Sequence, residues 1–140
     1  IGGSFVACEI AQAFRRLGSE VTVLARSRLL GYEAPEVGES LEAAFEAEGI
    51  RVLRDTQARH VSYNDDRFHL DLADERIEAD RLLVATGRTP NTADLELGNA
   101  GVETDDRGAI RVDAGLRTSA EGIYAVGDCA TMPQLVYVAA

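Results

Sequence analysis

The first 25 residues carry the pattern that most limits how this chain can fold. They read IGGSFVACEIAQAFRRLGSEVTVLA: a turn of glycines and small residues, then apolar residues at helical spacing, then β-branched residues. The spacing predicts a helix of about thirteen residues, with Gly18 after its end. Residues 20–25 predict a strand buried in a parallel sheet. The predicted buried face of the helix consists of Val6, Ile10, Ala13 and Leu17.

A second helix and strand are predicted from residue 35 onward. Pro35 suits the first helical turn because its missing N–H would have no partner there, and Gly49 suits the end of the helix. Residues 50–53 predict another strand. This alternation favours an α/β fold with a doubly wound, Rossmann-like sheet. The predicted apolar stripe is Val37, Leu41, Ala44 and Phe45, and the predicted solvent face is Glu36, Glu39, Glu42 and Glu46.

From residue 58 the apolar pattern changes from helical spacing to alternation. Val61 and Tyr63 alternate, the stretch NDDR forms a turn, and Phe68 begins a second alternating run. This pattern predicts an antiparallel meander laid on the α/β unit. Farther along, we expect buried strands at 81–87 and 123–128, a short strand near 109–112, and a helix that starts at Gln134.

The charge balance and the cysteine count limit the classes of partner. The net charge is −10 and all 14 basic residues are Arg, which argues against a nucleic-acid or acidic-membrane surface. No apolar run approaches the roughly 20 residues of a membrane span. Cys8 and Cys129 have no metal-binding spacing, and His60 and His69 are typical of strand surfaces. We therefore expect a soluble, cytoplasmic protein with neither a disulfide nor a metal site.

The opening turn has the outline of the G-x-G-x-x-G pattern. In that pattern the three glycines form the turn, let the backbone approach a pyrophosphate and allow close helix packing. Gly2, Ser4 and Ala7 occupy the three positions, with Gly3 between the first two. Small residues replace two of the glycines, so a turn without a ligand is an alternative interpretation.

The residues after the predicted strand 20–25 indicate which dinucleotide would bind. In an NAD-binding unit an acidic residue ends this strand and bonds the ribose 2′-hydroxyl. Ala25 stands there instead, followed by Arg26 and, two residues later, Arg28. Guanidinium groups pair with phosphate, so the pattern favours NADP(H) over NAD(H). The alternative is that both arginines are solvated loop charges.

Two further stretches make a family resemblance specific. ATGRTPN at 85–91 and TSAEGIYAVGD at 118–128 follow the glycine turn, and with them the whole chain resembles the two-dinucleotide-binding flavoprotein disulfide reductases. The resemblance implies FAD and NADPH as cofactors and a homodimer. It implies that residues 1–86 form most of an NAD(P)-binding domain and that residues 87–140 form the C-terminal part of an FAD-binding domain. The first strand, the rest of the FAD domain and the dimerisation domain are expected to lie outside this piece.

Within that family, three stretches are most similar to the mercuric reductases: residues 21–27, 82–92 and 123–140. This implies electron transfer from NADPH through FAD and a C-x4-C disulfide to Hg(II), giving Hg(0), where soft thiolates hold a soft metal. Those cysteines are absent here, so we expect an internal fragment without reductase activity of its own and with weak or no FAD binding. The alternatives are a dihydrolipoamide dehydrogenase-like or glutathione reductase-like member, or a non-catalytic nucleotide-binding module.

The resemblance also implies roles for single residues. Phe5 matches an aromatic that covers the flavin in some relatives, and Glu9 matches a glutamate that pairs with a lysine near the reactive flavin nitrogen; helix-start packing and the helix dipole are the alternatives. Arg26 matches the 2′-phosphate arginine of the NADPH-using members. Asp128 matches the acid that accepts a hydrogen bond from the ribityl chain, and Cys129 is read as structural. Glu9 is the supporting catalytic residue. The predicted cofactor-binding residues are Gly2, Gly3, Ser4, Phe5, Ala7, Arg26, Arg28, Thr86, Gly87, Arg88, Gly127 and Asp128.

Overall fold

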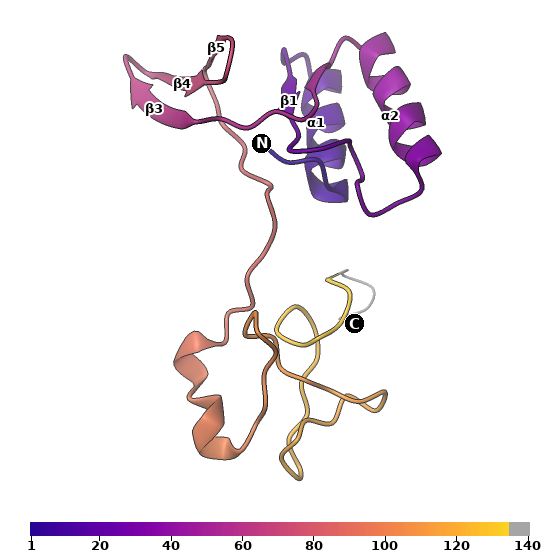
Figure 1. Ribbon diagram of the computed structural model, residues 1–140, viewed down its shortest axis with the longest axis vertical. Helices are drawn as coiled ribbons and strands as arrows, with labels where there is room; N and C mark the ends of the chain where they lie inside the picture. Colours follow the sequence, from indigo (N-terminus) through magenta and orange to yellow (C-terminus); the bar gives the residue numbers. More distant parts are fainter. Residues whose placement is uncertain (135–140) are drawn as a thin grey trace. The chain divides into compact units, whose positions relative to one another are not determined.

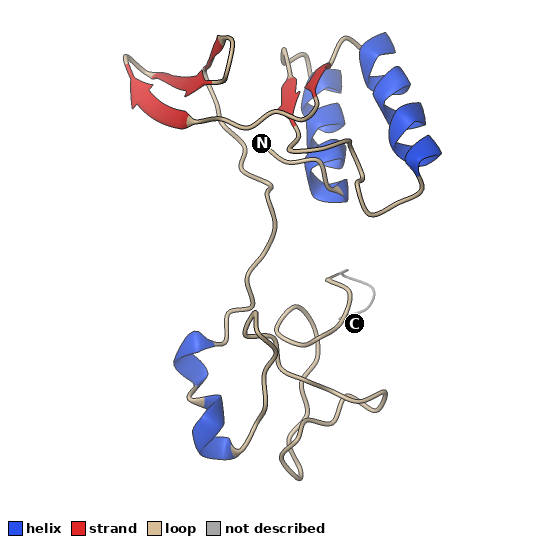
Figure 2. Ribbon diagram, viewed as in Figure 1, coloured by secondary structure: helices blue, strands red, loops and turns tan. Residues whose placement is uncertain are grey.

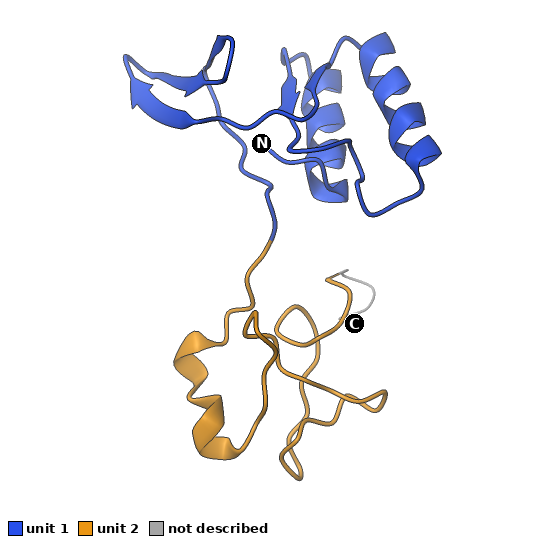
Figure 3. Ribbon diagram, viewed as in Figure 1, with its two compact units in different colours: residues 1–87 blue, residues 88–140 orange. Residues whose placement is uncertain are grey.

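The structure is a computed structural model that describes residues 1–134, and these form two compact units (Figure 3). Unit 1 comprises residues 1–87, and unit 2 begins at Arg88. The sequence places its domain boundary after residue 86. Each unit is described by itself below.

Unit 1 begins with an α/β segment in which two helices alternate with two strands (Figures 1 and 2). The elements are α1 (Phe5–Arg16), β1 (Thr22–Leu24), α2 (Pro35–Ala47) and β2 (Arg51–Leu53). The two strands are parallel, with Val23 opposite Val52. Pro35 occupies the first turn of α2, and Gly18 and Gly49 follow the helices with φ of 100° and 76°. The predicted α/β class and all four elements are confirmed.

The helices bury other faces than the sequence pattern predicts. In α1 the buried residues are Ala7, Cys8 and Ala11, whereas Leu17 is 81% exposed. Small side chains bring the helix axis close to the sheet, so the contact face follows the small residues and not the large ones. The corrected positions, which the sequence assigned to a buried face and the structure leaves exposed, are Val6, Ala13, Leu17, Val37 and Ala44.

The face of α2 toward the core shows the same rule. Phe45 is fully buried, and a Cβ added at Gly38 would lie 2.5 Å from the carbonyl oxygen of Leu29, so the backbone of α2 touches the preceding loop. Glu42, predicted to face solvent, is partly buried and pairs with Arg54 at 3.4 Å. The remaining predicted solvent-face glutamates, Glu36, Glu39 and Glu46, are exposed as expected.

An antiparallel meander completes unit 1. Its strands are β3 (His60–Asn64), β4 (Arg67–Asp71) and β5 (Arg76–Ala79), with β4 in the centre. Asp65 and Asp66 both have positive φ, 51° and 60°, which makes the predicted NDDR turn a two-residue hairpin of the mirror-image type. Strand β5 was not predicted because its sequence, RIEA, is only four residues long and has Ile77 as its only large apolar residue. Leu70 and Leu72 pack with Leu24 of β1 and join the meander to the parallel strands.

The predicted buried strand at 81–87 does not form. The segment has no regular strand, and Val84 is 64% exposed. Its backbone bonds to Ile1, whose amine donates to the Leu83 carbonyl at 2.7 Å and whose carbonyl accepts from the Ala85 amide at 2.8 Å. A strand needs a ladder of such bonds, and one residue supplies only two.

Unit 2 contains turns and bridges instead of regular strands. Two short 3₁₀ helices, η1 (Ala93–Leu95) and η2 (Leu97–Ala100), are followed by isolated bridges that pair Ile110 with Thr104 and Ala130. The predicted strands at 109–112 and 123–128 are therefore wrong as regular elements. A small core of Val102, Ile110, Ala125 and Ala130 holds the unit. Beyond Gln134 the predicted C-terminal helix lies outside the described residues.

Candidate functional site

The glycine turn has the backbone geometry that the motif requires. Gly2 has φ of +136°, and its amide donates to the Leu24 carbonyl at 2.9 Å. A Cβ added there would lie 2.3 Å from the Ala85 carbonyl oxygen and 3.3 Å from the Cβ of Ala7. Only glycine fits at Gly2, and only a small residue fits at Ala7. Ala7 therefore allows the close helix packing that the third glycine allows in the general pattern.

The start of α1 presents backbone amides that no described residue accepts. Ser4 is the N-cap in extended conformation, but its hydroxyl makes no capping bond; its carbonyl accepts from Cys8 at 3.0 Å. The amides of Phe5, Val6 and Ala7 make no hydrogen bond within residues 1–134, and the first turn has no acidic side chain. Free amides and the positive end of the helix together suit a phosphate group.

The two predicted phosphate-binding arginines differ in what they contact. Ala25 is buried and its amide bonds the Leu53 carbonyl at 2.9 Å, so Arg26 is the first exposed residue beyond the strand. Within the described residues Arg26 forms no hydrogen bond or ion pair, so all its donors can meet a ligand. Arg28 donates to the carbonyls of Gly31 at 3.0 Å and Glu33 at 2.8 Å.

Phe5 and Glu9 line one groove of about 200 Å³ that reaches Cys8, Gln12 and the α2 residues Leu41 and Phe45. Phe5 is half exposed and Glu9 is exposed, one turn apart on α1. Burial, followed by the charge of Glu9, raises the pKa of the Cys8 thiol to about 11. Such a thiol is almost wholly protonated at neutral pH, so Cys8 is a poor nucleophile and packs as a small apolar residue.

In unit 2 the structure brings together Arg88 and Asp128. The guanidinium Nη1 of Arg88 donates to Asp128 Oδ2 at 3.2 Å and to the Gln134 carbonyl at 3.1 Å. Gly127 precedes the aspartate with φ of +87°. The carboxylate stays half exposed, so it has room for a second partner. The Gln134 carbonyl was not predicted, because a backbone acceptor leaves no signal in the residue type.

Thr86 and Gly87 lie at the end of unit 1 and are exposed. Gly87 has φ of +136°, the same value as Gly2, but a Cβ added there would meet no atom within 4 Å. Position 87 thus favours glycine because of its backbone conformation and not because of close packing.

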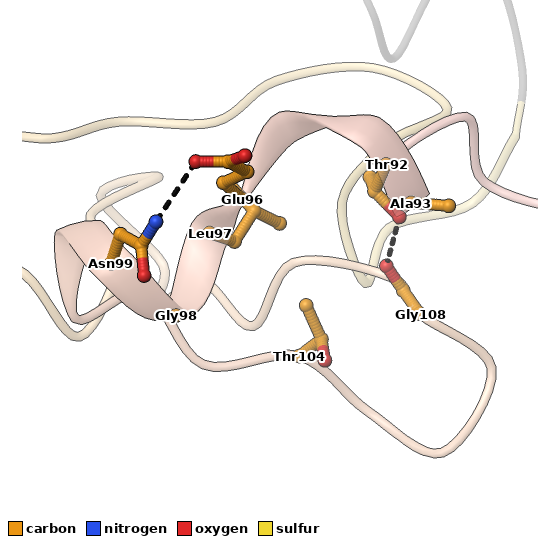
Figure 4. Close-up of a pocket in the computed structure, with 8 residues that line it drawn as sticks. All are labelled: Thr92, Ala93, Glu96, Leu97, Gly98, Asn99, Thr104 and Gly108. Atoms are coloured by element: carbon orange, nitrogen blue, oxygen red, sulfur yellow. Dashed lines mark hydrogen bonds between the residues drawn. The ribbon is translucent and has the colours of Figure 1, made fainter.

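A larger hollow, of about 560 Å³, lies in unit 2 and holds none of the predicted residues (Figure 4). Its wall is held by hydrogen bonds from Thr92 to the Gly108 carbonyl at 2.6 Å and from Asn99 to Glu96 at 2.9 Å. It is wide open and lacks converging charged groups, so the glycine turn is the better candidate site.

The described residues contain no cluster of three or more His, Cys, Asp or Glu side chains placed to hold a metal ion. Over the same residues, no helix has the length and apolar character needed to cross a membrane.

Comparisons with known proteins give the family of the chain. The model of the pyridine nucleotide-disulphide oxidoreductases matches residues 1–140. The mercuric reductase of Acidithiobacillus ferrooxidans is 56% identical over 140 residues, which are all of this chain and 26% of that protein. The chain therefore spans about a quarter of that relative's length.

Solved structures give the same family. An HOCl-induced flavoprotein disulfide reductase from Escherichia coli matches with a TM-score of 0.90 and 30% identity, over 99% of this chain and 32% of that one. An engineered water-forming NADPH oxidase from Lactobacillus brevis, bound to NADPH, matches with a TM-score of 0.81 and 25% identity, over 92% of this chain and 28% of that one. The family model and these matches show that the chain belongs to the pyridine nucleotide-disulphide oxidoreductase family.

Proposed function

We propose that this chain supplies the NADPH- and FAD-binding portion of a mercury(II) reductase. The enzyme would pass electrons from NADPH through FAD and a redox-active disulfide to Hg(II), giving Hg(0). The observation that carries the proposal is the 56% identity to a mercuric reductase, which extends over the whole of this chain. The redox cysteines would lie outside this sequence, since Cys8 is buried and Cys129 has no cysteine near it in the sequence.

For NADPH, the proposed contacts are the glycine turn, the free amides of α1 and Arg26. The turn residues Gly2, Gly3, Ser4 and Ala7 lead the backbone into the start of α1. A Cβ added at Gly2 would meet the Ala85 carbonyl, and one added at Gly3 would meet the Cβ of Ala25. The engineered NADPH oxidase supports the choice of cofactor. Its parent is an NADH oxidase. The substitutions introduce one alanine and, farther along that chain, an alanine, an arginine and a serine at three successive positions. Ala7, Ala25, Arg26 and Ser27 have the same identities at the same intervals here.

For FAD, the proposed contacts are Gly127, Asp128 and Arg88. The half-exposed carboxylate, oriented by the guanidinium at 3.2 Å, can accept a hydrogen bond from a ligand hydroxyl. The positive φ of Gly127 lets a ligand approach the backbone beside it. Phe5 and Glu9 would face the flavin, and Thr86 and Gly87 would form the crossing beside both cofactors. When bound, the two cofactors supply hydride and electron transfer.

We also propose that the whole enzyme is a cytoplasmic homodimer. Both statements rest on the resemblance to the flavoprotein disulfide reductases.

The test is anaerobic reduction of the FAD-loaded whole protein by NADPH or NADH, followed by Hg(II) in the presence of excess thiol. We expect bleaching of the flavin absorbance by NADPH at far lower concentration than by NADH, and then NADPH consumption that depends on Hg(II) with release of Hg(0). Oxidised glutathione and lipoamide serve as competing substrates. Flavin reduction without any Hg(II) dependence would keep the family and overturn the mercury assignment.

A further inference from the structure

The loop between β1 and α2, residues 26–34, is attached to the glycine turn at its centre. The Leu30 amide donates to the Gly3 carbonyl at 2.7 Å. Leu29 is fully buried and Leu30 nearly so, and Leu30 takes a left-handed backbone with φ of +49°. A branched residue adopts that conformation only when its surroundings hold it there. The shape of this loop is therefore coupled to the shape of the glycine turn.

Arg28 supplies bonds that hold the exposed half of the loop. One nitrogen, Nη2, donates to the carbonyls of both Gly31 and Glu33, and the Glu33 amide returns to the Leu30 carbonyl at 2.8 Å. A guanidinium Nη carries two hydrogens, so both are used within the loop. The side chain is directed at its own backbone and closes the turn that follows Leu30.

Arg26 offers the contrast. It lies directly after the buried Ala25, is exposed, and makes no hydrogen bond or ion pair to residues 1–134. The engineered NADPH oxidase points the same way: its substitutions include an arginine at the interval of Arg26 and another at that of Tyr32, and none at that of Arg28.

We infer that Arg28 is a positioning residue that holds the loop, and that Arg26 alone supplies the charge that distinguishes NADPH from NADH. The inference rests on the proposed nucleotide site. The family resemblance already matches Arg26 to the 2′-phosphate arginine. The new element is that Arg28, which the sequence pattern grouped with Arg26, holds the loop instead.

The experiment compares R26A, R28A and the control R81A. Arg81 is an exposed arginine of unit 1 whose side chain bonds only its neighbour, the Asp80 carbonyl, among the described residues. In each purified variant the dissociation constants for NADPH and NADH are measured by calorimetry. Amide hydrogen exchange at Leu30 and Glu33 reports the shape of the loop.

R26A is expected to weaken NADPH binding by about 10- to 100-fold, the range for loss of a charged hydrogen bond, with NADH binding and both amides unchanged. R28A is expected to weaken both nucleotides together, so that their ratio stays within about twofold, while both amides exchange about tenfold faster. R81A should change neither readout.

Loss of NADPH affinity alone in R28A, with both amides still protected, would show that Arg28 contacts the phosphate and would overturn the inference. If the unmodified protein binds neither nucleotide, the proposed function fails. The exchange comparison of R28A with R81A then still decides whether Arg28 holds the loop, and equal exchange in the two variants would refute that role.

Discussion

The two units of this chain are held together in different ways. Unit 1 has two helices packed on parallel strands, and its cores combine residues of several regular elements with the loop between β1 and α2. The fully buried residues are Phe45 of α2 and Leu29 of that loop. Unit 2 has two short 3₁₀ helices and isolated bridges around four small or medium apolar residues. There, side chains bond backbone: Asp105 and Asp113 accept amide bonds that close turns, and the Ser119 hydroxyl donates to the distant Gly101 carbonyl.

The difference shows that an apolar run becomes a strand only when a partner lies along it. Residues 22–24 and 51–53 are short, yet they pair with one another and are regular strands. The run at 123–126 is more apolar but has a bridge only at Tyr124, and Ile123 and Val126 stay exposed. Backbone groups without a ladder bond water or side chains instead.

The largest expected effect comes from truncating the centre of unit 1. Phe45→Ala removes a side chain that is 0% exposed and should lower the free energy of unfolding by about 3–5 kcal/mol. The matched control is Phe14→Ala on α1, where the ring is 52% exposed. Denaturant unfolding followed by circular dichroism at the helical band measures both. Equal losses in the two variants would mean that unit 1 does not depend on this core.

A smaller effect separates two glycines with the same backbone angle. Gly2→Ala combines a positive φ with a clash against the Ala85 carbonyl and should cost about 2–3 kcal/mol. Gly87→Ala has the same φ without the clash and should cost about 1 kcal/mol. Thermal unfolding of both variants measures the difference. If Gly87→Ala proved the more costly, close packing would not be the reason for Gly2.

The smallest expected effect is on stability at low pH, where the two units should differ in how strongly salt changes it. Amides lower the pKa of two turn carboxyls in unit 2: chiefly Ala109 for Asp105, and Arg117 with Gly115 for Asp113. In unit 1 the Arg76 side chain lowers the pKa of Asp71. A carboxyl whose pKa is lowered by folding contributes to the free energy of unfolding at pH values above its unfolded pKa of about 3.9. That contribution is lost as the pH falls through the pKa of the folded state.

Unfolding should therefore begin below about pH 4 in both units, but 1 M NaCl should weaken the contribution of the ion pair more than that of the amide bonds. Asp113→Asn should remove part of the acid transition in unit 2. The control is Asp106→Asn, which removes an exposed carboxylate that accepts no bond from the described residues. Amide resonances of Arg117 and Gly115 followed by NMR against pH measure the effect. A transition in unit 2 that shifts with salt as much as that of Asp71 would contradict the assignment.

Several features were predictable because a local cause was visible in the residues. Pro35 and the glycines after each helix mark the helix ends, and alternation marks β3 and β4. The buried face of α1 was not predictable from apolar spacing, because its large residues Val6 and Leu17 are exposed and its small residues pack. In the candidate site, the sequence grouped Arg26 with Arg28, while the structure separates an unengaged side chain from one bonded to Gly31 and Glu33.

By itself the sequence determined the α/β class, the glycine turn and the family, because each depends on residue types at short spacing. Only the tertiary structure decided that Gly2 must be glycine, because the atom that would clash belongs to Ala85, far along the chain. It likewise decided that 81–87 and 123–128 are not regular strands and that Arg88 meets Asp128. Pairing and close approach join distant residues, and no pattern of neighbours along the chain records which distant atoms meet.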